Sequence, residues 1–298
     1  MRAGEPIKTP DLPTTLERPP PFGTFAPTSF QQFVRKQAGK LPFNYFGRRL
    51  ASLLLGFAGG RRPRPYDVII FQNIRARLYP YDNISEKRVF LTPQHWDSDE
   101  RKILSDAISS HTASAFNFLD VGANAGLYSL FAYSVAKQSG KCLSAVCIEP
   151  AEEMRRRLLV NVSLAGAEDN ISTLAFAATA ENGTYRLVED QESRGMSRIE
   201  RSADSPSSNT TRMVEGRTLK SLAEEADFDR IDALKIDIEG HESEALKPFF
   251  DEVSKTLWPT FVIIEVSHDH EARKILTDSG YRIIYSNPKN SIFKLNNQ

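Results

Sequence analysis

The sequence predicts an α/β fold in which a mostly parallel central sheet is covered by helices on both faces. Three observations lead to this prediction. From residue 116 onward, short apolar segments alternate with segments of helical periodicity. The apolar segments 116–122, 142–150 and 260–267 lack the polar alternation of a half-exposed strand, so both of their faces should be buried. The last two predicted strands, within 281–296, form a hairpin that adds an antiparallel edge to the sheet.

Bulk properties restrict the class of protein. The 298 residues suit one large domain with attachments. Net charge is zero, but residues 1–65 carry a balance of +8, so the remainder is acidic, which argues against a general nucleic-acid binder. Cys142 and Cys147 should point to opposite faces of one strand, so we expect no disulfide between them and a reducing compartment. No signal-peptide pattern is visible, and we therefore predict a cytoplasmic protein.

Residues 1–65 form a basic, proline-rich N-terminal arm, which is predicted to be partly disordered and partly helical. Within it, Phe30, Phe33 and Val34 share one helical face, and a second face combines Phe46, Leu50, Leu53, Leu54 and Phe57. The favoured interpretation is that these helices pack on the main domain or on a second copy of the chain. The alternative is peripheral contact with a membrane surface or a partner.

The main domain is predicted to occupy 66–298, with 66–103 leading into a core at 104–298. The first segment should hold strands at 66–72, 74–80 and 87–92, followed by a helix within 92–108. In the core, strands are expected at 116–122, 142–150, 171–179, 231–238 and 260–267, with helices at 127–140, 151–165, 219–226 and 241–250 and another after residue 270. Residues 183–190 suggest an edge strand, and 191–212 form a long polar excursion.

The stretch LDVGANAGLYSL at 119–130 places flexible residues between a strand and a helix. Gly122 and Gly126 would let the backbone approach a ligand closely, with Ala123 and Asn124 between them. The spacing is GxxxG and not the GxGxxG of nicotinamide-dependent oxidoreductases, which disfavours that class. Asp120, ahead of the first glycine, would repel phosphate and attract a cation. A ligand with an amino group and a sulfonium therefore fits better, although the stretch could also be only a tight turn.

Two further motifs strengthen this interpretation. Glu149 ends the next strand, where an acidic residue commonly accepts hydrogen bonds from ribose hydroxyls; the alternative is a solvated strand end. The stretch LKIDIEGHESEAL at 234–246 places Lys235, Asp237 and Glu239 at alternate positions, so all three could face one way. Such charges are costly to bury unpaired, so they should contact one another, a metal or a substrate. A plain Lys–Asp ion pair is the alternative.

Together these stretches resemble the FkbM family of S-adenosylmethionine-dependent methyltransferases, from about Leu104 to Lys294. The resemblance implies a class I methyltransferase, Rossmann-like sheet with an antiparallel last strand. It implies that the loop from Gly122 to Gly126 lies along the methionine part of the cofactor, with Asp120 near its amino group and Glu149 on the ribose. The segment Ala177 to Thr179, including Ala178, would lie near the adenine. It further implies O-methylation of a hydroxyl on a small molecule or saccharide.

Hydroxyl methylation benefits from a general base, for which Asp237, Glu239 and His241 are the candidates, with Asp237 first. Lys235, Glu265 and His95 are predicted to contact the acceptor; Glu265 could equally be a solvated strand end, and His241 an exposed helix start. We predict no structural metal, with a divalent ion at Asp237 and Glu265 as a minor alternative. The rival functions are N-methylation and a non-catalytic protein that keeps the cofactor fold.

Overall fold

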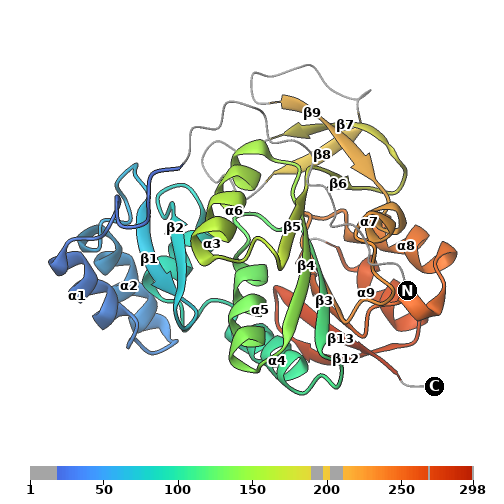
Figure 1. The fold of residues 1–298 in the computed structure, drawn as a ribbon, viewed down its shortest axis with the longest axis horizontal. Helices are drawn as coiled ribbons and strands as arrows, with labels where there is room; N and C mark the ends of the chain where they lie inside the picture. Colours follow the sequence, from blue (N-terminus) through green and yellow to red (C-terminus); the bar gives the residue numbers. More distant parts are fainter. Residues whose placement is uncertain (1–18, 189–196, 202–210, 268, 297–298) are drawn as a thin grey trace.

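The computed structural model describes residues 19–188, 197–201, 211–267 and 269–296. A seven-stranded sheet forms its centre (Figure 1). The strands run in the spatial order β5-β4-β3-β10-β11-β13-β12, and the first five of these are parallel. Their bounds are β3 Ala115–Val121, β4 Cys142–Ile148, β5 Ile171–Leu174, β10 Ala233–Ile236, β11 Phe261–Glu265, β12 Tyr281–Ser286 and β13 Asn290–Leu295. The chain order reverses between β3 and β10, which is where open α/β sheets bind ligands.

The closing hairpin lies at one edge of the sheet, as predicted. Its second strand, β13, lies between β11 and β12 and is antiparallel to both. Ile292 and Phe293 are both fully buried, one in each core, which only an internal strand allows. The edge strand is β12, where Ile283 and Ile284 are exposed.

Two helical layers cover the sheet. One consists of α4 (Ser98–Ser109), α5 (Leu127–Gln138) and α6 (Glu152–Ala165), and its core includes Phe116 and Phe118 of β3. The other consists of α7 (Leu219–Glu225), α8 (Glu242–Glu252) and α9 (Glu271–Asp278), and its core includes Leu119 and Val121 of the same strand. A short 3-10 turn, Lys255–Leu257, precedes β11. Side chains of β3 therefore point into two separate cores, one on each face of the sheet. A sheet covered by helices on both faces confirms the predicted fold class.

A second sheet lies beside the carboxyl end of β5 and is absent from the prediction. It contains β6 (Ala177–Ala178), β7 (Gly183–Val188), β8 (Arg198–Arg201) and β9 (Thr211–Arg217), in the order β6-β9-β7-β8. The predicted edge strand at 183–190 thus belongs to this sheet and not to the central one. Part of the polar stretch 191–212 is strand as well; residues 189–196 and 202–210 lie outside the described residues.

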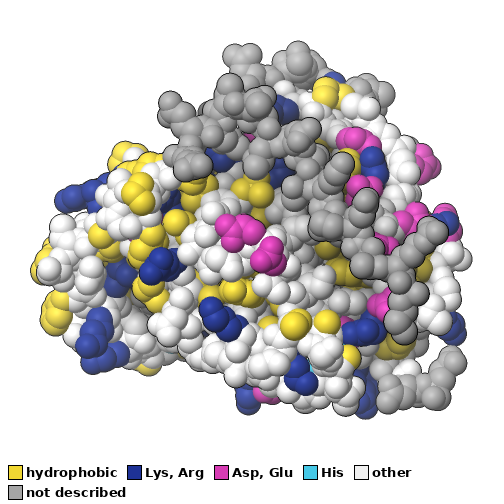
Figure 2. Space-filling model, in the orientation of Figure 1, with side chains coloured by type: hydrophobic (Ala, Val, Ile, Leu, Met, Phe, Trp, Pro, Cys, Tyr) yellow, Lys and Arg dark blue, Asp and Glu magenta, His cyan; other side chains and the backbone are white. Residues whose placement is uncertain are grey.

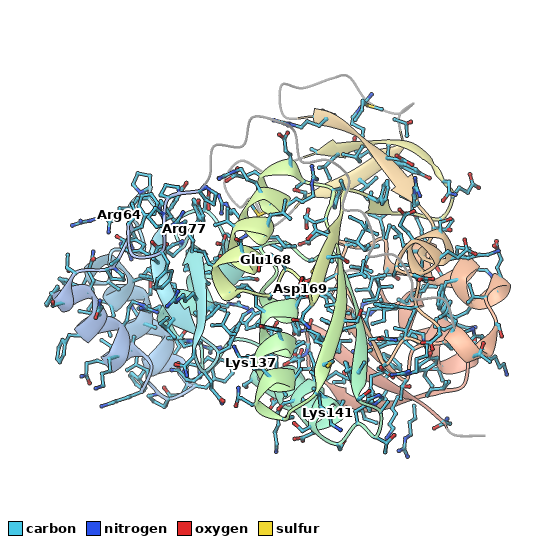
Figure 3. The ribbon with its side chains drawn as sticks, viewed as in Figure 1. Arg64, Arg77, Lys137, Lys141, Glu168 and Asp169 are labelled. Carbon is cyan, nitrogen blue, oxygen red and sulfur yellow. The ribbon has the colours of Figure 1, made fainter. Side chains whose placement is uncertain are left out.

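The N-terminal part forms the end of the molecule opposite α7–α9 (Figure 1). It comprises α1 (Ser29–Ala38), α2 (Tyr45–Phe57), the hairpin of β1 (Tyr66–Ile70) and β2 (Ile74–Leu78), and α3 (Ile84–Leu91). Arg77 of β2 binds Asp67 at 2.7 Å and donates to the Pro20 carbonyl (Figure 3), which ties the start of the described chain to the hairpin. Residues 1–18 of the predicted leader lie outside the described residues.

The segment 87–92, predicted as a strand, is part of helix α3. The Asn83 side chain accepts a hydrogen bond from the backbone N–H of Glu86 and begins this helix, and the apolar residues Val89, Phe90 and Leu91 are buried. A short apolar run is compatible with a strand or a helix, and the capping residue Asn83 favours the helix here.

Helices form at both amphipathic patterns of the arm, but the expected contact faces are only partly used. Val34 of α1 and Leu55 of α2 are buried in the same core as Tyr66 of β1. Phe30 and Phe33 are exposed, as is the face of Phe46, Leu50, Leu53 and Phe57, which was expected to pack on the main domain or on a second copy of the chain. Hydrophobic and basic side chains together cover this end of the molecule (Figure 2).

Candidate functional site

A cavity of about 300 Å³ opens at the carboxyl ends of β3, β4 and β10. Its size is at the lower end of the range for small-molecule sites. The lining contains the predicted Gly122, Ala123, Asn124, Glu149, Ala178, Lys235, Asp237, Glu239 and Glu265. Side chains from α3 and from the segment before α4 complete it, including Asn83, Arg88, Trp96 and Asp97. The sequence motifs that lie far apart along the chain thus meet at one place.

The loop between β3 and α5 forms one wall. Gly122 and Gly126 both have left-handed backbone, with φ of +70° and +80°. A Cβ on Gly122 would lie 1.9 Å from the backbone oxygen of Asp237, so the glycine is required for the chain after β10 to pass this close. Two successive N–H groups, of Gly122 and Ala123, donate to the Ile148 carbonyl at 3.0 Å and fix the loop against β4.

Glu149 is buried at the end of β4 and is held by backbone donors. Its two carboxylate oxygens accept from the N–H of Asn124 at 2.8 Å and of Ala151 at 2.9 Å. Burial raises the pKa of Glu149 to about 7, although both of these hydrogen bonds oppose the shift. The carboxylate lines the cavity and retains lone pairs for further donors, such as hydroxyl groups.

Asp120 lies behind the cavity wall and does not line it. It is fully buried, and its Oδ2 accepts from the Ser129 hydroxyl at 2.7 Å. Its Oδ1 has no hydrogen-bond partner among the described residues and lies 3.9 Å from the Lys235 ammonium. Burial raises the pKa of Asp120, and Lys235 counteracts this. The resemblance implied that Asp120 lies near the cofactor's amino group, directly or through water. In the structure Lys235, opposite Asp120 on β10, lines the cavity and Asp120 does not.

Lys235 holds the loop as well as two carboxylates. Its ammonium donates to the Gly122 carbonyl at 2.8 Å and lies 3.5 Å from Asp237 Oδ2. Burial alone would lower the pKa of Lys235, but Asp237 and Asp120 outweigh it and the pKa is raised. Lys235 is therefore a cation that fixes the loop after β3 and the Asp237 carboxylate, and its ammonium is less available to an acceptor.

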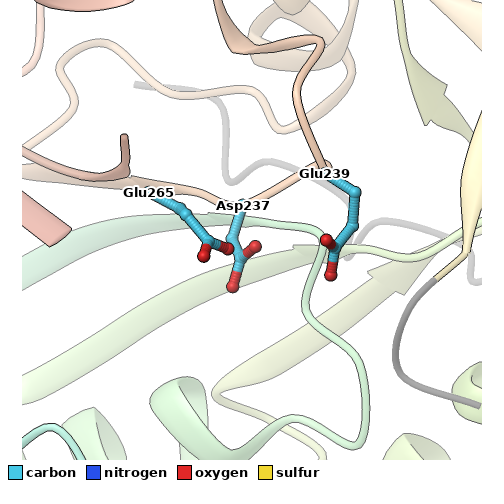
Figure 4. A group of neighbouring side chains, drawn as sticks. All are labelled: Asp237, Glu239 and Glu265. Atoms are coloured by element: carbon cyan, nitrogen blue, oxygen red, sulfur yellow. The ribbon is translucent and has the colours of Figure 1, made fainter. Parts of the chain in front are cut away.

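Three carboxylates meet beside Lys235. Asp237, Glu239 and Glu265 have carboxylate oxygens within 4.8 Å of one another (Figure 4). Burial and the hydrogen bond and charge of Asp237 raise the pKa of Glu265. Burial would likewise raise the pKa of Asp237, but Lys235 and the hydrogen bond from Glu265 lower it overall. Asp237 therefore loses its proton more readily than Glu265.

Other predicted residues lie elsewhere. His241 begins α8 and its ring contacts Glu244 at 3.4 Å; it does not line the cavity, because the left-handed Glu239 and Gly240 turn the chain away. Thr179 also does not line it, since its hydroxyl donates to the Glu181 carbonyl. His95 contacts the Leu41 carbonyl at 2.6 Å and lines a second cavity, of about 490 Å³, between α2 and the β12–β13 turn. Arg88, Asp97 and Lys289 line both cavities, which therefore adjoin.

Several residues of the site were not predicted. Asn83 donates to the Asn124 side chain at 2.8 Å and so ties α3 to the loop. Asn161 accepts from the Arg77 N–H and donates to the Ala125 carbonyl, which joins α6, β2 and the loop. Tyr128 donates to Asp97 at 3.0 Å across the cavity rim. The Asn-x-x-Glu spacing at 83–86 was a usable signal for α3; the others depend on contacts between distant segments.

The sequence of this chain also matches the profile of a known protein family. The profile described as Methyltransferase FkbM domain matches residues 120–283, which is more than half of the chain. The chain belongs to the FkbM methyltransferase family. Membership confirms the predicted family and agrees with S-adenosylmethionine as the predicted cofactor. The matched range includes the loop, Glu149 and all three clustered carboxylates.

Solved structures resemble this chain distantly. A methyltransferase FkbM from Methylobacillus flagellatus KT is 15% identical over 89% of this chain, with a TM-score of 0.42; the alignment spans 58% of that longer chain. The METTL16 methyltransferase domain is 11% identical over 87% of this chain and 86% of its own, with a TM-score of 0.45. A putative tRNA (m1A22) methyltransferase from Streptococcus pneumoniae, solved with S-adenosyl-L-methionine, is 12% identical over 67% of this chain and 74% of its own, with a TM-score of 0.39. No curated protein matches the chain.

Proposed function

We propose that this member of the FkbM family transfers a methyl group from S-adenosylmethionine to a hydroxyl of a small molecule or saccharide, with Asp237 as general base. The observation that carries the proposal is the state of Asp237. It lines the cavity, its carboxylate is about one-third exposed, and its pKa is lowered by Lys235. A carboxylate held ionised in a cavity can accept a proton.

The residues of the cavity fit the cofactor. Gly122 lines the cavity and leaves no room for a side chain against the chain that follows β10, and Glu149 offers an acceptor for ribose hydroxyls. Asp120 and Asp237 supply negative charge on both sides of Lys235, which suits a ligand that carries an ammonium and a sulfonium. When bound, this cofactor supplies the electrophilic methyl group.

The chain's own residues would then act on the acceptor. Asp237 would orient the acceptor hydroxyl and take its proton as the oxygen attacks the methyl carbon. Lys235 would keep Asp237 ionised and in place. Glu265, whose pKa is raised beside Asp237, would in its protonated form donate a hydrogen bond to Asp237 and hold the base in one orientation. The contiguous second cavity, lined by His95, offers room for the remainder of the acceptor.

Asp237→Asn tests this proposal. The variant should lose about 10²–10⁴-fold in turnover at saturating cofactor, because it removes the proton acceptor. It should still bind the cofactor, since the loop and Glu149 are unchanged. His241→Gln is the matched control and should keep full activity, because His241 lies outside the cavity. The substrate panel should pair each hydroxylated acceptor with its amine analogue. Turnover of amines alone would favour N-methylation, and wild-type cofactor binding with no turnover on any acceptor would favour the non-catalytic alternative.

A further inference from the structure

The exposed face of α1 and α2 is an unusual surface for a water-soluble domain. Eight large hydrophobic side chains are exposed here, in a short span of the chain: Phe30, Phe33, Phe43, Tyr45, Phe46, Leu50, Leu53 and Phe57. We call these residues the arm's apolar face. Contiguous exposed apolar surface of this kind marks an interaction site more often than chance.

The opposite side of the same helices explains why the face stays exposed. Val34, Ala38 and Leu55 are buried against the β1–β2 hairpin and α3. Polar contacts fix the arrangement: Gln31 lies 3.5 Å from the Tyr66 hydroxyl, which donates to the Gly59 carbonyl, and Arg35 donates to the Phe90 carbonyl at 2.8 Å. The helices are thus anchored through one side, and folding of the described chain leaves the apolar face outward.

The charged residues within the arm's own helices and loops are all of one sign. Residues 19–65 contain eight Lys and Arg and no Asp or Glu. Arg48 and Arg49 stack on Phe43 and Tyr45 of the face, at 5.8 and 5.6 Å, and Arg61 donates to the Ser52 carbonyl of α2. In the described part of the chain, none of the basic residues of 35–64 forms an ion pair. Acidic side chains occur outside 19–65: Asp67 is paired with Arg77; Asp97, Asp99 and Glu100 line the second cavity; and Glu168 and Asp169 lie between α6 and β5 (Figure 3).

From this combination we infer that the arm's apolar face docks on an anionic lipid surface. Helices with hydrophobic residues on one side and Lys or Arg beside them lie in the headgroup region of such membranes. Contact through this face between two copies would bring like charges together. The side chains also protrude, with Phe46 exposed by 79%, and a bilayer accepts protruding side chains where a protein partner would need matching pockets.

The contact would be peripheral. No helix of the described residues has the length and apolar character to cross a bilayer. The face also adjoins the site: Phe43, Gly47, Arg48 and Ala51 from this part of the chain line the second cavity, which in turn adjoins the first at Arg88. A lipid surface at α2 would therefore lie next to the route by which we propose the acceptor enters. The docking inference itself does not depend on that route or on the chemistry.

Vesicle sedimentation with the full chain tests the inference. The chain should sediment with vesicles of phosphatidylcholine and phosphatidylglycerol and not with phosphatidylcholine alone. Phe46→Ser/Leu53→Ser should weaken this binding by at least about tenfold, because it removes inserted apolar surface. Arg49→Gln and Arg61→Gln should each weaken binding to the anionic vesicles about fivefold. Added salt should weaken this binding as well.

Met213→Ser/Ile283→Ser is the matched control, since both residues are exposed hydrophobics of the main body. It should bind vesicles like the wild type, and circular dichroism should show all variants folded. Absence of binding to anionic vesicles, or equal binding by the Phe46/Leu53 variant, would overturn the inference. So would a dimer in analytical ultracentrifugation that the same variant dissociates, because the face would then be a contact between copies.

Discussion

Replacing Arg157 by methionine should destabilise the fold by about 3–5 kcal/mol, because it leaves buried carboxylates without their cation. Arg157 on α6 has almost no exposed surface. Its guanidinium binds Asp82 at 2.8 Å, Glu86 at 2.8 Å and Glu153 at 3.0 Å, and it lies over the Tyr79 ring at 3.9 Å. The network joins α6 to the start of α3, and so positions Asn83 beside the cofactor loop.

The stability lost in Arg157→Met should depend on pH and should grow as pH rises. Burial raises the pKa of Glu86 to about 7 even with Arg157 present, and removal of the cation should raise it further. A carboxyl whose folded pKa exceeds its unfolded value stabilises the fold when protonated, and this stability is lost as pH rises through the folded pKa. The deficit of Arg157→Met should therefore be smallest at acidic pH and grow through neutrality.

Urea unfolding followed by circular dichroism measures both effects. Arg156→Met is the control: Arg156 binds the same Glu153 at 2.9 Å but is substantially exposed, so its loss should cost below about 1 kcal/mol. A cost for Arg157→Met no larger than that of Arg156→Met, or a deficit that shrinks as pH rises, would refute the reasoning.

Three further predictions concern the site. Gly122→Ala should abolish cofactor binding. The control variant Gly140→Ala, with a similar positive φ but no atom within 4 Å of its new Cβ, should bind the cofactor normally. Equal affinities of the two variants in calorimetry would show that the loop tolerates a side chain. Cofactor affinity should fall as pH drops below about 7, by up to about tenfold per pH unit, because Glu149 then becomes protonated, and Glu149→Gln should remove this dependence. Activity should persist in excess EDTA, because Lys235 and Lys289, 3.5 and 3.7 Å from the clustered carboxylates, already supply positive charge there. Activity that is lost in EDTA and restored by Mg²⁺ would instead assign a metal to Asp237, Glu239 and Glu265.

The central sheet could be predicted from sequence because its strands are apolar on both faces and alternate with helices. The position of β13 inside the sheet could not, since hydrophobicity alone does not say which strands are neighbours. The second sheet was missed for a similar reason: β7 and β9 are polar and half-exposed, and pairing between segments more than 20 residues apart holds them together.

The candidate site was predictable where it follows strand ends. Glu149, Asp237 and Glu265 end or follow neighbouring parallel strands, so they had to meet at one edge. Asp120 and His241 do not line the cavity, and the sequence could not show this because their orientation depends on local detail. Lys235 takes the cavity-facing position next to Asp120, and the left-handed Glu239 redirects the chain before His241. Asn83 and Asn161 depend on packing of distant elements, which no local pattern encodes.

Calorimetric titration with S-adenosylmethionine tests most directly whether the cavity at β3, β4 and β10 is the cofactor site. The wild-type chain should bind S-adenosylmethionine and not NADH. Glu149→Ala should weaken binding about tenfold to a hundredfold, the value of a hydrogen bond to a charged group. Failure of the wild type to bind S-adenosylmethionine, or undiminished affinity in Glu149→Ala, would contradict the assignment of this cavity.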